Sequence, residues 1–272
     1  MTKKEHIDKK GWVLYKNVFT PDEIKAIRKK ALVNSDNSTD LLSNKLLKDV
    51  LLDSRVTDIY AELLDVKELV YYGDSTFTTN IKGDGFHKDS RVRFNRKSDE
   101  WNGKEYSLIR MAIYLQDHSK HSGGISLREG SHFYPDLNKG KIKNIRTEIG
   151  DVVLWKMTTT HSANAWIFKW FPNYFLSPRI MRRLPKFLMQ SVEKPRIALF
   201  VTFGKNDHYM HNLIDYLKTR KCALTRWYNS KYDSTQIEDF KKNNVTVLIP
   251  SDEELKSIPE SSISIPHKEP LD

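Results

Sequence analysis

Four short runs rich in β-branched and aromatic residues follow Lys67, and they constrain the fold of this chain more than any other feature. The runs are LVYYGDSTFTTNI, LIRMAIYLQD, DVVLWKM and RIALFVTFG, and Gly, Asn, Asp and Ser separate them. Runs of this length and composition, bounded by turn residues, are typical of strands in antiparallel sandwiches and barrels. We therefore predict an antiparallel sheet sandwich or barrel as the centre of the fold.

The residues before Lys67 have the pattern of a strand followed by helices. GWVLYKNVF alternates as a short strand does, and Thr20 and Pro21 then occupy positions typical of a helix N-cap and a first helical residue. Between Leu41 and Leu64 the apolar spacing is mostly helical. The predicted fold class is therefore mainly β with flanking helices.

The length of the chain, 272 residues, is enough for one sizeable domain with a full core, and we predict a single domain over residues 1–272. Its 45 Lys and Arg residues exceed its 35 Asp and Glu residues, which gives a formal net charge of +10. This charge favours encounters with anionic partners such as nucleic acid, a membrane surface or a small anionic substrate, without deciding among them.

Two features predict a cytoplasmic protein. Cys222 is the single cysteine, so no internal disulfide indicates an oxidising compartment. The opening MTKKEHIDKKGW has no apolar core of the signal-peptide type, and no stretch approaches the roughly 18 uninterrupted apolar residues of a membrane span. We therefore expect cytoplasmic localisation, with at most peripheral contact with a membrane.

A candidate metal site comes from two segments, GDGFHKDSR and GDVVLWKMTTTHSANAW. Side chains two apart in a strand point to the same face, so His87 and Asp89 can converge on one ion. The third ligand must come from elsewhere in the sheet, and His161 ends the second segment's strand run. Two histidines and one carboxylate leave positions open for a co-substrate and dioxygen, as in non-haem Fe(II) oxygenases. His132 follows a turn signal in GGISLREGSHF and is expected to be structural.

The sequence resembles the phytanoyl-CoA dioxygenase family in three motifs that occur in the same order: His-x-Asp, a Gly-rich stretch ending in Gly-Ser-His, and Gly-Asp-x-x-x-Trp leading to a distal His. The resemblance ends at about Gly204 and leaves residues 205–272 as a C-terminal extension. It implies a double-stranded β-helix, a jelly-roll or cupin-like barrel, with Fe(II) held by His87, Asp89 and His161. It also implies 2-oxoglutarate as co-substrate, dioxygen as oxidant, and hydroxylation of an unactivated C–H bond with release of succinate and CO2.

Arg196 is the residue that we predict to bind the distal carboxylate of 2-oxoglutarate. A bidentate arginine suits the geometry of a carboxylate. An arginine that opens the apolar strand RIALFVTFG is also costly to bury unless it is paired. It follows His161 at a longer spacing than the family's arginine does, because residues 164–194 form an insert. A solvent-facing arginine at a strand edge is the alternative.

Basic residues near the motifs favour a small-molecule substrate with negative charge. Lys88, Arg91 and Arg93 lie in or just after the metal motif, and Arg128 lies in the Gly-rich stretch. Together with Trp166 from the insert, they are candidate substrate contacts. A solvated basic rim is the alternative, because exposed Lys and Arg are common on any surface.

The insert at residues 164–194 combines aromatic and basic residues, with no acidic residue before Glu193. This composition suits a segment at an anionic interface. Pro172, Pro178 and Pro185 prevent a single long amphipathic helix, so we predict two short helical pieces. Three roles stay open: a lid over the pocket, contact with a membrane or lipid substrate, and a dimer contact. The sequence does not determine the oligomeric state.

Other classes of function also stay open. A non-catalytic binding module of the same fold would lack a metal ligand or the co-substrate arginine, and all four are present. An oxygenase acting on a protein or nucleic acid would use the same ligands, which therefore do not exclude it. No nucleic-acid partner is expected, because the sequence has no helix-turn-helix, zinc-finger or RNA-recognition signature. The ligands name neither the substrate nor the outcome, since desaturation, ring closure and epimerisation begin with the same hydrogen abstraction.

Overall fold

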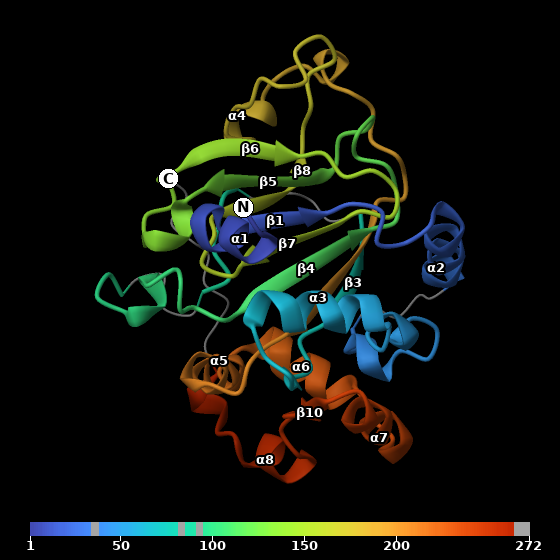
Figure 1. The fold of residues 1–272 in the computed structure, drawn as a ribbon, viewed down its shortest axis with the longest axis vertical. Helices are drawn as coiled ribbons and strands as arrows, with labels where there is room; N and C mark the ends of the chain where they lie inside the picture. Colours follow the sequence, from blue (N-terminus) through green and yellow to red (C-terminus); the bar gives the residue numbers. More distant parts are fainter. Residues whose placement is uncertain (34–37, 81–84, 91–94, 264–272) are drawn as a thin grey trace. The chain divides into compact units, whose positions relative to one another are not determined.

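The computed structural model describes residues 1–33, 38–80, 85–90 and 95–263, which form a mixture of helices and sheets (Figure 1). The helices are Lys3–Lys10 (α1), Pro21–Val33 (α2), Ser54–Leu64 (α3), Pro178–Met181 (α4), His208–Lys218 (α5), Lys221–Asn229 (α6), Ser234–Lys242 (α7) and Asp252–Ser257 (α8). The strands are Trp12–Tyr15 (β1), Leu69–Tyr71 (β2), Thr76–Thr79 (β3), Ile109–Tyr114 (β4), Gly124–Glu129 (β5), Lys141–Ile145 (β6), Val152–Lys156 (β7), His161–Ala165 (β8), Ile197–Phe203 (β9) and Val245–Val247 (β10). No helix in this described part of the chain has the length and apolar character to cross a membrane.

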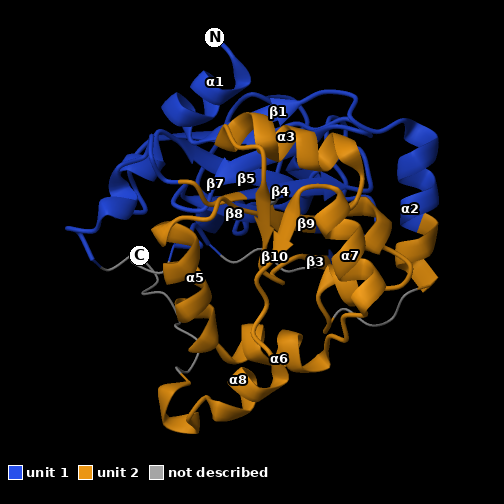
Figure 2. Cartoon of the chain, turned by 60° about the horizontal axis from the view of Figure 1, so that its bottom comes forward, with its two compact units in different colours: residues 1–28, 78–106, 110–199 blue, residues 29–77, 107–109, 200–272 orange. Residues whose placement is uncertain are grey.

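The chain divides into two compact units (Figure 2). Unit 1 contains residues 1–28, 78–106 and 110–199, and unit 2 contains residues 29–77, 107–109 and 200–272. Each unit combines stretches that are distant in the sequence, and the predicted extension at 205–272 belongs to unit 2 with α3. The single domain over residues 1–272 stays a prediction.

The strands form three sheets. Their orders are β1-β7-β4-β9-β3, β6-β5-β8 and β10-β2. β1 lies antiparallel to β7, and β5 lies antiparallel to both β6 and β8, whereas β10 and β2 are parallel. The antiparallel pairing predicted from the sequence is therefore present, but the described strands do not close into a barrel, and helices contribute more than a mainly β class implies.

The predicted strand runs all contain strands, with one interruption. LIRMAIYLQD, DVVLWKM and RIALFVTFG contain β4, β7 and β9, and LVYYGDSTFTTNI splits into β2 and β3. The split lies at Gly73, whose φ of +69° is in the left-handed region. A Cβ atom there would also lie 2.8 Å from the indole nitrogen of Trp227, so the turn needs a glycine.

The predicted start of α2 is confirmed, whereas the helical pattern after Leu41 is only partly realised. Thr20 and Glu23 form a reciprocal cap, with Glu23 N donating to Thr20 Oγ1 at 3.2 Å and Thr20 N donating to Glu23 Oε2 at 2.7 Å. Residues 41–43 and 48–50 form single 3₁₀ turns. The carboxylate of Asp40 and the amide of Asn44 accept hydrogen bonds from nearby backbone N–H groups, which favours turns over a continuing helix.

The Gly-Asp pair before β7 is a structural joint in unit 1. Gly150 has a φ of +93°, and its carbonyl oxygen accepts a hydrogen bond from Phe19 N at 3.0 Å. The buried Asp151 carboxylate accepts from the backbone N–H groups of Asn17 and Glu148, both at 3.0 Å. These contacts fix the start of β7, whose continuation at Met157 contacts the metal motif.

Gly150→Ala is expected to lower the free energy of unfolding by about 3 kcal/mol, the strain of a left-handed residue plus an overpacking cost. The new Cβ would lie 2.0 Å from Phe19 O, so the backbone must shift. Gly130→Ala is the matched control, because its φ is +77° and its Cβ would meet nothing within 4 Å; it should cost about 1 kcal/mol. Urea unfolding of both variants measures the difference, and equal losses would contradict a role for the close approach at Gly150.

Candidate metal centre

The metal motif is held in unit 1 by backbone pairing with the segments around β8. His87 and His161 form an antiparallel bridge in which each N–H donates to the other's carbonyl oxygen at 2.9 Å. Asp89 N donates to Met157 O at 3.0 Å. His161 opens β8 and lies opposite Leu127 of β5, so it begins a strand, whereas we had predicted that it ends one.

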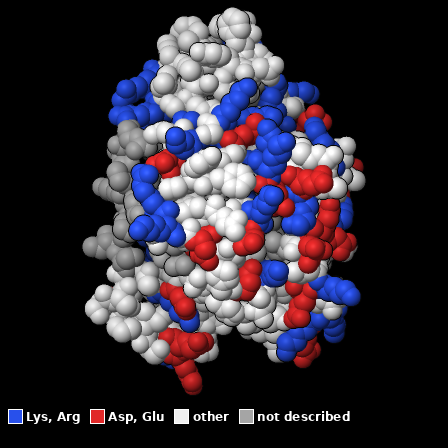
Figure 3. Space-filling view, turned by 60° about the vertical axis from the view of Figure 1, so that its left-hand side comes forward, with Lys and Arg blue, Asp and Glu red and all other residues white. Residues whose placement is uncertain are grey.

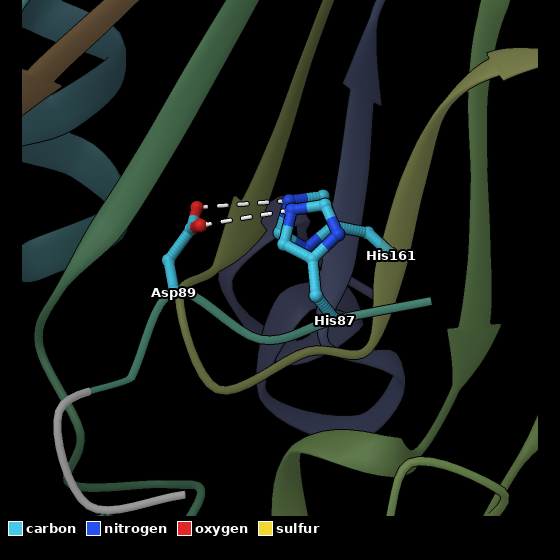
Figure 4. A group of neighbouring side chains, drawn as sticks. All are labelled: His87, Asp89 and His161. Carbon is cyan, nitrogen blue, oxygen red and sulfur yellow. Dashed lines mark ion pairs between the residues drawn. The ribbon is translucent and has the colours of Figure 1, made fainter. Parts of the chain in front are cut away.

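The three predicted ligands come together in the structure (Figure 4). One ligand atom from each of His87, Asp89 and His161 lies within 4.8 Å of the other two. His161 Nε2 is 3.6 Å from Asp89 Oδ2, and His87 Nε2 is 3.9 Å from Asp89 Oδ1. The two imidazoles face the carboxylate from neighbouring positions, with their ring centroids 4.4 Å apart.

Both histidines present Nε2 to the carboxylate because their other nitrogen is occupied. His87 Nδ1 lies 3.2 Å from Gly85 O, and His161 Nδ1 lies 3.0 Å from Thr159 O. A carbonyl oxygen can only accept, so each Nδ1 carries a proton, and Nε2 is the nitrogen left to face a metal. Histidine metal ligands are commonly oriented in this way, by a second hydrogen bond to a carbonyl.

The charges around the site also suit a metal cation. Burial lowers the pKa of His161 to about 4, although Asp89 opposes the shift, so its imidazole is neutral near pH 7. Arg110 Nη1 lies 3.1 Å from Asp89 Oδ2 and holds the carboxylate in place. Neutral imidazoles and an ionised carboxylate are the forms that coordinate metals, so the donor set fits a divalent ion with positions left open.

Arg110 is a site residue that our sequence prediction missed. It lies in β4, inside the run LIRMAIYLQD, where its neighbours are apolar and buried. An arginine within an apolar strand was the signal that identified Arg196, and the same signal was present here.

Lys88 occupies a different place from the one predicted. We expected it to contact substrate, but its side chain is fully buried, and Nζ donates to Ser131 O at 2.9 Å and Thr158 O at 2.6 Å. The ammonium group also lies 5.6 Å from the centre of the Trp101 ring. Lys88 therefore ties the metal motif to the turn after β5 and to the segment before β8, with no exposed charge to offer a substrate.

Of the other predicted substrate contacts, the structure describes Arg128 and Trp166. Arg91 and Arg93 lie outside the described residues. Arg128 Nη1 donates to the carbonyl oxygens of Asn138 and Gly140, and its guanidinium lies 4.8 Å from the centre of the Phe86 ring, one residue before His87. Trp166 is half-buried, and its carbonyl oxygen accepts from Asn144 Nδ2.

Arg196 is a buried cation without a carboxylate among the described residues. Its side chain is 2% exposed, Nε donates to Gly123 O, and the guanidinium lies 5.4 Å from the centre of the Tyr114 ring. Neither Nη atom makes a hydrogen bond of ordinary geometry within the described chain, and the polar side chain that interacts with the guanidinium is that of Tyr114. Burial lowers the pKa of Arg196, and Tyr114 opposes the shift. Burying a guanidinium in this way is costly unless an anion compensates it.

The Arg196 guanidinium and the metal ligands are connected through one strand pair. Arg196 contacts Gly123, which precedes β5, and β5 pairs with β8 so that Leu127 lies opposite His161. Gly124 and Leu127 are about 10 Å apart along an extended strand. This strand pair therefore carries the Arg196 contact near one end and the metal ligand His161 near the other.

His118 lies beside Arg196, and the sequence prediction missed it as it missed Arg110. His118 is buried, and its pKa falls to about 3 because of burial and then of the Arg196 charge. Its ring packs edge-on to Tyr114, with centroids 4.8 Å apart. By contrast, His132 is structural as predicted: it is buried, and its Nε2 lies 3.0 Å from Asp8 O.

Comparison with known proteins finds likeness in solved structures. HygX from Streptomyces hygroscopicus, solved with nickel and 2-oxoglutarate bound, has a TM-score of 0.52 at 14% identity over 76% of this chain and 88% of its own. SnoN, a non-heme alpha ketoglutarate dependent epimerase from nogalamycin biosynthesis, has a TM-score of 0.50 at 14% identity, over 74% of this chain and 80% of its own. EvdMO1 has a TM-score of 0.53 at 13% identity over 75% of this chain, which spans only 50% of the length of EvdMO1.

These similarities show a shared fold. No protein-family model matches the chain, and no curated protein matches it.

His161→Ala is expected to weaken Ni²⁺ or anaerobic Fe(II) binding by more than the roughly 10- to 100-fold that loss of an outer-sphere partner costs, because it removes one of three ligands. Isothermal titration calorimetry measures the affinity. His211→Ala is the control, because His211 is exposed on α5 of unit 2. Wild-type affinity in His161→Ala would contradict the ligand assignment.

Lys88→Met is expected to weaken metal binding by about tenfold, because the two carbonyl oxygens lose the cation that fixes the motif. Lys97→Met, which alters an exposed lysine later in the chain, should leave the affinity unchanged. Isothermal titration calorimetry measures the metal affinity of both variants. If the two variants bound metal equally well, Lys88 would have no part in positioning the ligands.

Proposed function

We propose that this protein is an Fe(II)- and 2-oxoglutarate-dependent oxygenase of the phytanoyl-CoA dioxygenase type, which hydroxylates an unactivated C–H bond of a small molecule and releases succinate and CO2. One observation carries the proposal: a face of two histidines and one carboxylate shares the β5–β8 pair with a buried, uncompensated guanidinium. A metal site alone suits many ions, and a buried arginine alone suits many anions. Their combination suits a co-substrate that both chelates a metal and carries a distal carboxylate.

Dioxygen is the oxidant: with iron and 2-oxoglutarate bound, one of its oxygen atoms would go to the substrate C–H bond and the other to succinate, as 2-oxoglutarate loses CO2. The chain's own residues bind the metal and the co-substrate and orient them. His87, Asp89 and His161 would hold the metal, and Arg110 keeps the Asp89 carboxylate in its place. Arg196 compensates the distal carboxylate of 2-oxoglutarate in a water-excluded environment, where a charge-assisted hydrogen bond is strong.

The carboxylate at position 89 favours oxygen transfer over halogenation, because halogenases of this architecture have Ala or Gly there and leave the position to chloride. SnoN is an epimerase, so epimerisation is a second candidate outcome for the same ligand set. The jelly-roll barrel implied by the family resemblance is part of this proposal, as is a small-molecule substrate. Of the predicted substrate contacts that the structure describes, only Arg128 supports a negatively charged substrate.

The direct test is succinate release by the Fe(II)-loaded protein, given 2-oxoglutarate and pooled metabolites. Stimulation by one pool, with a product that has gained oxygen, is the expected result. A product altered only in configuration would favour the epimerase. No succinate release with any pool, together with tight binding of a metabolite, would favour a non-catalytic binding module.

Arg196→Gln should weaken 2-oxoglutarate binding by about 10- to 100-fold, because a charge-assisted contact contributes roughly 1.5–3 kcal/mol. Calorimetric titration of 2-oxoglutarate into the Ni²⁺-loaded protein measures this change, and Ni²⁺ affinity should stay at the wild-type value. Arg55→Gln, a change in the first turn of helix α3 in unit 2, is the control. Unchanged 2-oxoglutarate binding in Arg196→Gln would assign the distal carboxylate to another residue.

A further inference from the structure

The predicted insert forms a projection from unit 1. Its two ends, residues 167–169 and 188–190, are paired with each other, and we call them its legs. Phe168 and Met189 pair as an antiparallel bridge, Lys169 N donates to Leu188 O at 2.9 Å, and Gln190 N donates to Ile167 O at 2.8 Å. Ile167 and Met189 are buried, so the legs are fixed to the body of the unit. We call residues 170–187, which lie between the legs, the aromatic tip. In Figure 1 this segment, with α4, extends beyond β6.

The aromatic tip exposes an unusual concentration of apolar side chains. Its exposed large residues are Trp170 (63%), Phe171 (68%), Tyr174 (59%), Ile180 (49%) and Phe187 (67%). They are five of the eleven large hydrophobic side chains exposed in the described chain, and they fall within 18 residues. The tip is not unfolded, because α4 buries Pro178 and Met181 on its inner side. Contiguous exposed apolar surface of this kind marks an interaction site.

The charges on and beside the aromatic tip have one sign. All five basic residues from Trp166 to Val192 are exposed, and this stretch contains no Asp or Glu: the basic residues are Lys169, Arg179, Arg182, Arg183 and Lys186. Figure 3 shows an uncoloured projection at the top of the view, with Lys and Arg side chains on the surface below it. Exposed aromatic and basic residues without acidic ones match the composition of segments that settle on anionic bilayers.

We propose that the aromatic tip docks this protein peripherally on a bilayer surface that contains anionic phospholipid. The rings, with Trp170 and Tyr174 suited to the headgroup region, enter the interface, and the five cations contact lipid phosphates. The tip thereby directs the enzyme toward membrane-associated substrate or product, a role that goes beyond the catalytic proposal.

Charge argues against a symmetric dimer through the same tip. A two-fold interface places the same patch on both subunits, so five cations would face five cations. Interface centres are also depleted in Lys and in charge generally. Single-stranded nucleic acid would use the aromatic rings and the cations, but it would gain little from the exposed Ile180 or from the half-buried Leu176 and Leu184 beside it.

The test is co-sedimentation of the full chain with vesicles of phosphatidylcholine, alone or mixed with phosphatidylglycerol. Binding is expected only to the mixed vesicles, and added salt should weaken it. Phe171→Ser combined with Phe187→Ser should reduce binding by about a hundredfold. Arg179→Gln, Arg182→Gln and Arg183→Gln together should reduce it by a similar factor. Leu46→Ser combined with Tyr134→Ser removes two exposed apolar side chains elsewhere and should have no effect.

Two further measurements keep the outcome interpretable. Ni²⁺ affinity shows that each variant is folded, and succinate release in the absence of vesicles should be unchanged in the tip variants. A failure of vesicle binding is thereby distinguished from a failure of the catalytic proposal. The docking proposal is overturned by no binding to the mixed vesicles, by equal binding to phosphatidylcholine alone, or by aromatic-tip variants that bind like the wild type. It is also overturned if those variants convert a dimer to a monomer, or if a single-stranded oligonucleotide binds more tightly than the vesicles.

Discussion

The paired backbone hydrogen bonds between His87 and His161 are the contact on which the candidate site depends. Residues directly opposed in an antiparallel pair project to the same face, so this bridge places both imidazoles together. Asp89, two residues further along extended backbone, returns to that face and is held by Met157 O. Because His161 is also fixed opposite Leu127, the ligands inherit the rigidity of the β5–β8 pair.

A second constraint is the burial of charged side chains near the β5–β8 pair, where each buried charge needs a partner. Asp89 has Arg110 as its counter-ion, and Lys88 is surrounded by carbonyl oxygens. Arg196 has neither a carboxylate nor a hydrogen bond of ordinary geometry at its Nη atoms within the described chain. A protein that satisfies its other buried charges at this site and leaves one guanidinium uncompensated has a place for an anion, and the open metal face lies on the same strand pair.

Local pattern was sufficient to predict β1, β2, β3, β4, β7 and β9, the start of α2, and which three side chains would meet. Those features depend on side-chain alternation, on capping chemistry and on motif order, which the sequence carries directly. It was not sufficient for Lys88 or Arg110, because their roles depend on which distant carbonyl or carboxylate the fold brings near. The 3₁₀ turns at 41–50 depend on side-chain competition for backbone N–H groups, and the two compact units depend on long-range packing. Apolar periodicity reports neither.

The most direct measurement is a crystal structure grown anaerobically with Fe(II) and 2-oxoglutarate, with anomalous scattering recorded at the iron edge. A single iron peak should lie between the Nε2 atoms of His87 and His161 and the carboxylate of Asp89, with the distal carboxylate of 2-oxoglutarate against the Arg196 guanidinium. Iron bound elsewhere, or 2-oxoglutarate held away from Arg196, would contradict the assignment of this site.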